Sequence, residues 1–209
     1  MNITYAITVC NEFVEIQRLV AFLLQHKRHE DNIVILYDEA NGDPKIESFL
    51  RSHSVNNEFR WHSAKFDGHF ANWKNKLSSL CTGDYIFQID ADELVSEDTC
   101  NLIPQVIEAN DVDVIRVPRI NTVKGLTDQH IAKWGWQVNE HGWVNFPDYQ
   151  WRIYRNTESI KWEGKVHEYL TGFSTIAHLP ANDQNTEFCL LHNKTIERQE
   201  RQNSYYNSL

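Results

Sequence analysis

Two aspartates separated by one small residue follow an apolar run at residues 85–89. In Asp90-Ala91-Asp92, side chains two residues apart point to the same side while the backbone stays extended, so both carboxylates face one space. Two like charges held together are unfavourable unless a cation joins them. Hard oxygen ligands with room for water and phosphate suit Mg²⁺ or Mn²⁺. The pair therefore predicts a divalent-metal site.

A second interpretation of these acids is structural. Negative charge is favourable at the amino end of a helix, and Glu97 and Asp98 fit the first turn of a helix expected after Ser96. Asp90 fits that interpretation poorly, because it still belongs to the end of a strand. An Asp-x-Asp pair is a weak motif when it stands alone. The elements around it must therefore decide which chemistry is supported.

Strand patterns alternate with helix patterns over the first half of the chain. Short apolar runs predict the strands, and apolar residues at helical spacing predict the helices. Asn11, Asp43 and Ser96 are expected helix N-caps. Gly83 is expected to end the third helix. The expected strands are 3–9, 33–37, 59–62, 85–89 and 112–117, and the expected helices are 13–26, 44–50, 69–81 and 97–110.

This alternation predicts an α/β fold with an open, mainly parallel sheet covered by helices on both faces. In such sheets, ligands bind beyond the carboxyl ends of the strands. Three polar clusters stand at those ends: Asn11-Glu12, Asp38-Glu39 and the segment 90–93. The predicted metal site thus coincides with the edge where this kind of sheet binds its ligands.

The sequence changes character after Arg119. Residues 121–147 are rich in Trp, Gly, His and Asn and show no clean period, so this part is expected to be irregular. Strand-like pieces resume at 149–155, and a polar helix is expected at 194–206. The chain is expected to be a single domain, 1–209, with a small Trp-rich elaboration on its second half.

The bulk composition narrows the possible partners. The net charge is −9 and no block of basic residues occurs beyond Lys27-Arg28, which argues against DNA or RNA. Four cysteines without a Cys-x-x-Cys pair indicate neither a zinc site nor a disulfide framework. The sequence shows no signal-peptide pattern and no transmembrane segment, so a cytoplasmic location is expected. Attachment to further domains stays open.

A series of short motifs runs through the chain in order: Thr8 to Glu12, Tyr37 to Glu39, Asn75, Thr82 to Ile86, Asp90 to Glu93, Pro147 to Arg152, and Trp162 to Glu168. Together they resemble family two glycosyltransferases with the GT-A nucleotide-diphospho-sugar transferase fold, from Ile3 to about His192. The last motif is similar to the subgroup related to lipopolysaccharide-core glucosyltransferases. The family often has a Ser- or Gly-rich stretch where this chain has residues 39–43, so the nucleotide base stays open.

The resemblance implies a cleft that binds a nucleoside-diphosphate sugar as donor, with UDP as the expected nucleotide. A carboxylate suits an imide N–H or paired ribose hydroxyls, because it accepts two hydrogen bonds. Asn11 and Asp38 would alternatively be only a helix cap and a turn residue. The implied nucleotide-sugar-binding residues are Val9, Asn11, Glu12, Asp38, Asn75, Asp90, Ala91 and Arg152, and Arg155 and Lys165 are further candidates to counter the diphosphate charge.

Mn²⁺ or Mg²⁺ is the cofactor that the resemblance implies. Asp92 and Asp90 are the implied metal ligands, joined by a histidine near the diphosphate. His167 is the first candidate for that histidine, and His192 is its rival. A lone histidine is more often a hydrogen-bonded structural residue, so the residue type alone decides neither assignment.

An inverting transfer needs a carboxylate that takes the proton of the acceptor hydroxyl. Asp148, followed by an arginine four residues later, is similar to the acidic motif of the family, although Pro147 replaces the usual glutamate. Asp148 is the expected base, and Glu163 and Glu168 are its rivals. The alternative for Asp148 is a Pro-Asp turn residue.

Three tryptophans in the segment 121–147 are candidates for acceptor binding: Trp134, Trp136 and Trp143, beside His130 and His141. Aromatic faces stack on the apolar faces of sugar rings, which suits a lid over a glycan acceptor. The opposing interpretation is that a small lobe needs large side chains for its own core.

The expected function is an inverting, metal-dependent transfer of a sugar to a hydroxyl of a glycan or similar acceptor. Residues 1–119 are expected to bind the donor and residues 120–209 the acceptor. Two other classes stay open. A nucleotidyltransferase usually has a Gly-rich basic loop after its first strand, which residues 10–13 do not provide. A non-catalytic sugar-binding module would not need a paired-aspartate metal site.

Overall fold

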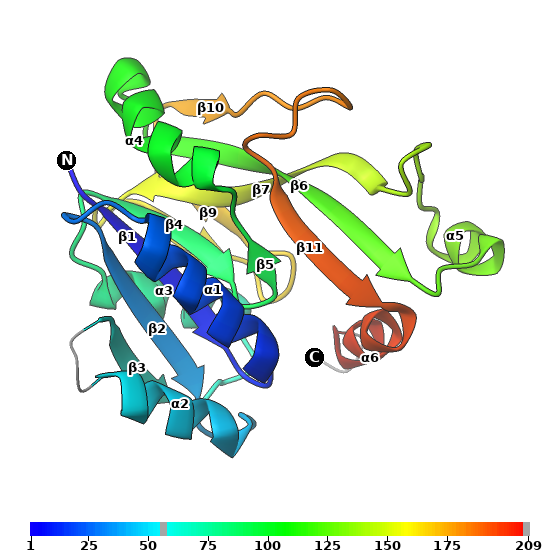
Figure 1. Ribbon diagram of the computed structural model, residues 1–209, viewed down its shortest axis with the longest axis horizontal. Coiled ribbons are helices and arrows are strands. Elements are labelled where there is room, and N and C mark those ends of the chain that lie inside the picture. Colours follow the sequence, from blue (N-terminus) through cyan, green and yellow to red (C-terminus); the bar gives the residue numbers. More distant parts are fainter. Residues whose placement is uncertain (55–57, 207–209) are drawn as a thin grey trace.

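The computed structural model describes residues 1–54 and 58–206 (Figure 1). The helices are α1 Phe13–His26, α2 Pro44–Ser54, α3 Phe70–Leu80, α4 Glu97–Asn110, α5 Asp128–Trp134 and α6 Ile196–Tyr206. The strands are β1 Ile3–Val9, β2 Asn32–Asp38, β3 Arg60–Ala64, β4 Tyr85–Asp90, β5 Glu93–Leu94, β6 Val114–Lys124, β7 Val144–Arg155, β8 Lys161–Glu163, β9 Tyr169–Thr171, β10 Ile176–His178 and β11 Leu190–Thr195.

One large mixed sheet joins the two halves of the chain in the order β3-β2-β1-β4-β7-β6-β11-β5. The strands β3, β2, β1 and β4 are parallel, whereas β7 runs antiparallel between β4 and β6. Both β10 and β11 pair in parallel with successive parts of β6. The strands β8 and β9 form a separate hairpin. The expected α/β fold with an open, mainly parallel sheet is confirmed.

The sheet is covered on both faces, which explains why its first strands read as continuous apolar runs. Alternate residues of β1, such as Tyr5 and Ile7, pack with the apolar faces of α1, α2 and α4. Ala6 between them faces the other side, where it joins α3 and the β8–β9 hairpin. Each fully buried aliphatic side chain of this kind contributes about 1.5–3 kcal/mol. Both faces of the predicted sheet thus carry a core.

The expected helix boundaries hold closely over the first half. The helix α1 has the predicted bounds, and the Ser96 side chain accepts a hydrogen bond from the Thr99 N–H at the start of α4. The prediction that Asn11 is the N-cap of α1 is wrong. Glu12 occupies that position, and its carboxylate folds back to accept the N–H groups of Cys10 and Asn11 at 2.9 and 3.0 Å. No helix among the described residues is long and apolar enough to cross a membrane.

Gly83 has a different role from the predicted one. The helix α3 already ends at Leu80, and Cys81 at its end has extended backbone. A Cβ on Gly83 would lie 2.6 Å from the backbone nitrogen of Thr4. The glycine is therefore required because the chain passes against β1, not because it stops a helix.

The expectation of an irregular segment at 121–147 is wrong in large part. The strand expected at 112–117 continues as β6 to Lys124, α5 follows, and β7 begins at Val144 rather than at 149. The outer part of β6 shows no clean apolar alternation because its residues 119 and 121–123 line a polar cleft instead of the core. In Figure 1, α5 and α6 lie at the end of the molecule away from α4.

Candidate active site

A cleft of about 1030 Å³ lies at the carboxyl ends of β1, β2 and β4 and extends along β6, β7 and α6. Strand register brings its walls together, because Thr8 on β1 stands beside Asp90 on β4. The predicted site residues that do not line it are Asn75, Trp134, Trp143, Arg155, Glu163 and Lys165. The predicted residues that do line it are Val9, Asn11, Glu12, Asp38, Asp90, Ala91, Asp92, Trp136, Asp148, Arg152, His167, Glu168 and His192.

The end of the cleft next to β1 and β2 is built around Asp38. This carboxylate is 4% exposed and accepts hydrogen bonds from the N–H of Ala40, the N–H of Phe66 and the side chain of Asn41. Asn41 also lines the cleft. Asp38 thus fixes the loops that contain Ala40 and Phe66 beside the cleft. Asp38 itself also lines the cleft.

A buried ion cluster forms the floor below the Asp-x-Asp segment. Arg152 on β7, 2% exposed, donates to Asp90 Oδ2 and to Glu93 Oε1, each at 2.6 Å. Gln88 donates to the second oxygen of Asp90 at 2.9 Å. Burial disfavours the charge of Asp90, but the cations of Arg152 and Lys74 outweigh this effect and hold the pKa of Asp90 well below its ordinary value. Asp90 is therefore ionised and held rigidly.

Replacing Arg152 with methionine is expected to lower the free energy of unfolding by about 3–5 kcal/mol, because two carboxylates would stay in the protein without their shared cation. Arg155→Met is the matched control. Arg155 binds Asp111 and Asp113 at the other end of β7, away from the cleft, and its pair with Asp111 is exposed. That variant should lose about 1 kcal/mol or less. Equal losses in urea titrations of the two variants would contradict this account of the cluster.

A chain of polar contacts leads from Asp92 across the cleft. His192 on β11 lies with Nε2 3.1 Å from Asp92 Oδ2 and Nδ1 2.7 Å from Asn121 Oδ1. The Asn121 amide donates its N–H to Asp148 Oδ2 at 2.8 Å. The amide oxygen therefore faces His192 and requires the proton on Nδ1. In a neutral ring, the lone pair of Nε2 then points at the Asp92 carboxylate.

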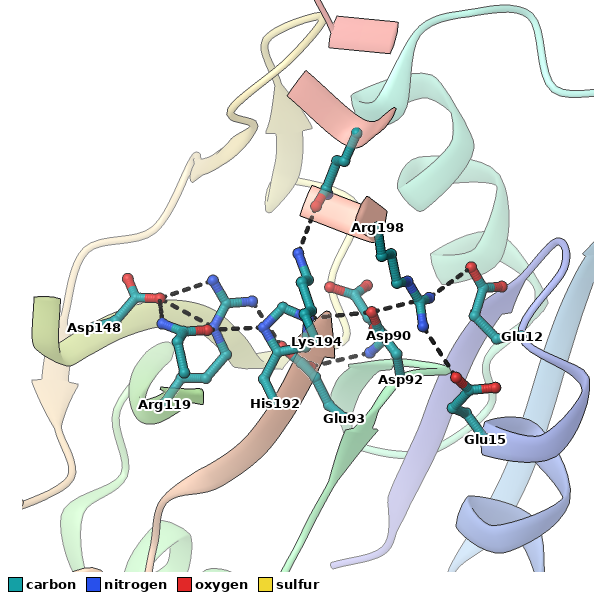
Figure 2. Close-up of polar contacts among 12 residues, drawn as sticks. Glu12, Glu15, Asp90, Asp92, Glu93, Arg119, Asp148, His192, Lys194 and Arg198 are labelled. Atoms are coloured by element: carbon teal, nitrogen blue, oxygen red, sulfur yellow. Dashed lines mark hydrogen bonds and ion pairs between the residues drawn. The ribbon is translucent and has the colours of Figure 1, made fainter. Parts of the chain in front are cut away.

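This donor set fits a divalent cation. The Nε2 lone pair of a neutral His192 and the Asp92 carboxylate lie 3.1 Å apart and can share a divalent cation. Carboxylate oxygen is a ligand that suits Mn²⁺. Arg198 of α6 already places a guanidinium 3.2 Å from Asp92, and Figure 2 shows it between Asp92, Glu12 and Glu15. The first candidate His167 lies elsewhere on the cleft wall, with its ring next to Tyr206.

Asp148 is held by four hydrogen bonds. Oδ2 accepts Arg119 Nε and Nη2 at 3.0 and 2.7 Å as well as Asn121, and Oδ1 accepts Gln150 at 2.7 Å. The β6–β7 register places Arg119 directly opposite Asp148. Burial raises the pKa of this carboxyl, but the Arg119 charge and the hydrogen bonds outweigh burial and lower it overall.

The two rival carboxylates have other surroundings. Glu163 is exposed on β8, where it accepts a hydrogen bond from the Thr171 hydroxyl at 3.0 Å. Glu168 lines the cleft and pairs with Lys74 of α3. Only Asp148 is joined through Asn121 to the Asp92–His192 pair.

One of the three candidate tryptophans lines the cleft, and the other two do not. Trp136 lines the cleft. Trp134 stacks on His130 and packs on Trp136 with ring centroids 4.6 Å apart. Trp143 packs on His141 and Phe146. Trp134 and Trp143 thus pack on neighbouring rings of the small lobe, where they are half-buried rather than part of a core.

Several charged residues of the cleft region were not assigned roles from sequence, among them Lys74, Glu93, Arg119, Lys194, Arg198 and Arg201. Arg119 bridges Glu93 and Asp148, and burial lowers the pKa of the Lys194 ammonium to about 8. The sequence did contain one pattern that could have indicated the cleft-facing side of α6. Arg198, Gln202 and Tyr206 recur at helical spacing, and all three line the cleft.

Comparisons with known proteins agree with this geometry. The model of glycosyl transferase family 2 matches residues 4–178. The crystal structure of residues 1–349 of S. aureus TarS is similar with a TM-score of 0.61 and 13% identity over 92% of this chain. The complex of the same fragment with UDP-GlcNAc gives a TM-score of 0.60 at 13% identity over 93% of this chain.

These likenesses show the fold. The chain spans 60% and 59% of the length of those two TarS chains. A search of curated proteins found no match. The family match extends over most of the chain and includes β1, the Asp-x-Asp segment and β7. The chain therefore belongs to glycosyl transferase family 2 and has the GT-A fold.

Proposed function

We propose that this protein is an inverting, metal-dependent glycosyltransferase that moves a sugar from a UDP-sugar to a hydroxyl of a glycan acceptor. One observation carries the proposal. A single chain of contacts, Asp92–His192–Asn121–Asp148, joins a set of metal-ligating groups to a carboxylate in the same cleft. A transferase needs both groups in one cleft, and this cleft provides them together.

The donor nucleotide is placed at the end of the cleft next to β1 and β2. Val9, Asn11 and Asp38 line that end, and Asp90 and Asp92 line the same cleft. S. aureus TarS, which shares the fold, has been solved with UDP-GlcNAc, and this supports UDP as the nucleotide. Residues 1–119 then supply the donor side, and residues 120–209 supply the acceptor side.

The metal would be Mn²⁺ or Mg²⁺, and Asp92 and His192 would hold it, with Asp90 in the same segment of the cleft. When bound, the cation would neutralise the negative charge of the leaving diphosphate. Lys194 and Arg198 add positive charge on the same side of the cleft. Arg152 has a different role from the one expected, since it is used in fixing Asp90 and Glu93.

Asp148 takes the proton of the acceptor hydroxyl as that oxygen attacks the anomeric carbon of the sugar. Its lowered pKa keeps it ionised at neutral pH, and Arg119 and Gln150 fix its direction. Trp136 lines the acceptor side of the cleft and offers a face for a sugar ring. The motif 162–168 supports a place in the subgroup related to lipopolysaccharide-core glucosyltransferases.

Calorimetric titration with a panel of nucleotide sugars tests the proposal. One UDP-sugar is expected to bind with Mn²⁺ or Mg²⁺ present and to lose most of its affinity in EDTA, because the diphosphate would then meet Asp90 and Asp92 without a cation. Binding that is equally tight in EDTA would contradict the metal site. Transfer or hydrolysis of the bound donor separates the enzyme from a non-catalytic sugar-binding module.

A further inference from the structure

One ion pair on the cleft wall has no part in the proposed mechanism. Lys74 of α3 and Glu168, in the loop between β8 and β9, form a salt bridge, and their side chains are only 7% and 15% exposed. Both residues line the cleft. Among the described residues, Lys74 is the one ion-pair partner of Glu168. The pair uses Glu168 Oε1, and within the part of the chain that the structure describes the other carboxylate oxygen has no hydrogen bond or ion pair.

The loop that carries Glu168 is fixed against α3. The Asn75 side chain donates to the Trp162 carbonyl at 2.8 Å and accepts the Trp162 N–H at 2.9 Å. The Phe70 N–H donates to the Lys165 carbonyl at 3.0 Å. Asn75, which the sequence assigned to donor binding, thus lies behind the cleft wall and holds the β8 strand. These contacts give Glu168 a defined position.

Lys74 is held just as firmly. Its ammonium lies 4.4 Å from the centroid of the Trp162 ring, and Trp162 is buried with its own N–H on the Tyr154 hydroxyl. A lysine placed at such a buried site loses solvation, and the pair with Glu168 offsets this loss. The positive charge of Lys74 also acts on Asp90, so the pair stands close to the Asp-x-Asp segment.

We propose that the Lys74–Glu168 pair recognises hydroxyl groups of the transferred sugar and so sets the donor-sugar preference. The inference rests on the proposed function. The sugar of a donor must lie between the diphosphate, next to Asp90 and Asp92, and the base Asp148. A carboxylate accepts hydrogen bonds from two neighbouring hydroxyls, while an ammonium donates to one of them. The pair thus matches a sugar with adjacent free hydroxyls.

Glu168→Gln tests this with UDP, UDP-glucose and UDP-N-acetylglucosamine as probes in Mn²⁺. The parent is expected to bind one UDP-sugar more tightly than UDP. In Glu168→Gln the affinity for that sugar nucleotide should fall by about tenfold to a hundredfold, as for the loss of hydrogen bonds to a charged group. Its affinity for UDP should stay within about twofold, since the nucleotide end of the cleft is unchanged.

Two further variants make the result decisive. Glu158→Gln changes an exposed carboxylate before β8 and should behave like the parent. Glu168→Asp keeps a carboxylate and should recover part of the sugar affinity. Parent-like sugar affinity in Glu168→Gln, or an equal loss for UDP and UDP-sugar, would overturn the inference. A parent that binds none of the probes would instead refute the proposed function itself.

Discussion

Asp92→Asn is expected to remove Mn²⁺-dependent binding of the nucleotide sugar, with a loss of at least about a hundredfold in affinity. Mutation of a residue that hydrogen-bonds to a metal ligand typically lowers metal affinity or activity by about tenfold to a hundredfold. Mutation of a direct ligand should lower it by no less. The amide keeps the shape of the side chain but lacks the negative charge that faces His192. Calorimetry with the donor in Mn²⁺ measures the change.

Asp98→Asn is the control for that variant, because Asp98 is an exposed acid in the first turn of α4. It should bind the donor as the parent does. Melting temperatures of both variants will show whether each remains folded. Unchanged donor affinity in a folded Asp92→Asn protein would remove Asp92 from the metal site.

Asp148→Asn is expected to lower the rate of transfer by about a hundredfold to ten-thousandfold, the usual contribution of general-base assistance. Donor affinity should stay near that of the parent, because the carboxylate faces the acceptor side of the cleft. The variant also weakens one ion pair with Arg119. Transfer rate, donor affinity and melting temperature should therefore be measured on one preparation.

A stable, donor-binding Asp148→Asn protein with nearly full transfer rate would exclude Asp148 as the base. Glu168 would then be the first alternative, since it lines the cleft, and exposed Glu163 the second. The pH profile offers a second check. The pKa of Asp148 is lowered from its ordinary value of 3.8, so protonation of this group should cause no loss of rate as the pH falls from about 8 to 5.

The first half of the fold could be predicted because its strands β1, β2 and β4 are buried on both faces. Each such strand reads as an apolar run, and α1 between two of them carries a clear apolar stripe. The carboxyl ends of β1, β2 and β4 then had to meet at one edge. This is why the polar clusters around Asn11, Asp38 and Asp90 could be placed together before the structure was known.

In the second half, the expected strand at 149–155 and the expected helix at 194–206 are present within β7 and as α6. The segment between β6 and β7 escaped prediction for a physical reason. The strand β6 leaves the core and turns polar side chains such as Arg119 and Asn121 toward the cleft, so its pattern no longer alternates between apolar and polar. Contacts such as His192 to Asp92 join residues 100 positions apart. Strand pairing creates these contacts, and the spacing of residues along the chain does not predict them. The proposal of His192 rather than His167 as the metal-ligating histidine rests on this contact.

Release of UDP from the donor identified in the binding panel tests the central claim most directly. The rate should be measured with acceptor and Mn²⁺, with EDTA in place of Mn²⁺, and with the Asp92→Asn protein. The account predicts UDP release and glycosylated product in the first reaction, almost none in the other two, and recovery of the chelated sample when Mn²⁺ is added back. Full release in EDTA, or full release by Asp92→Asn, would contradict it.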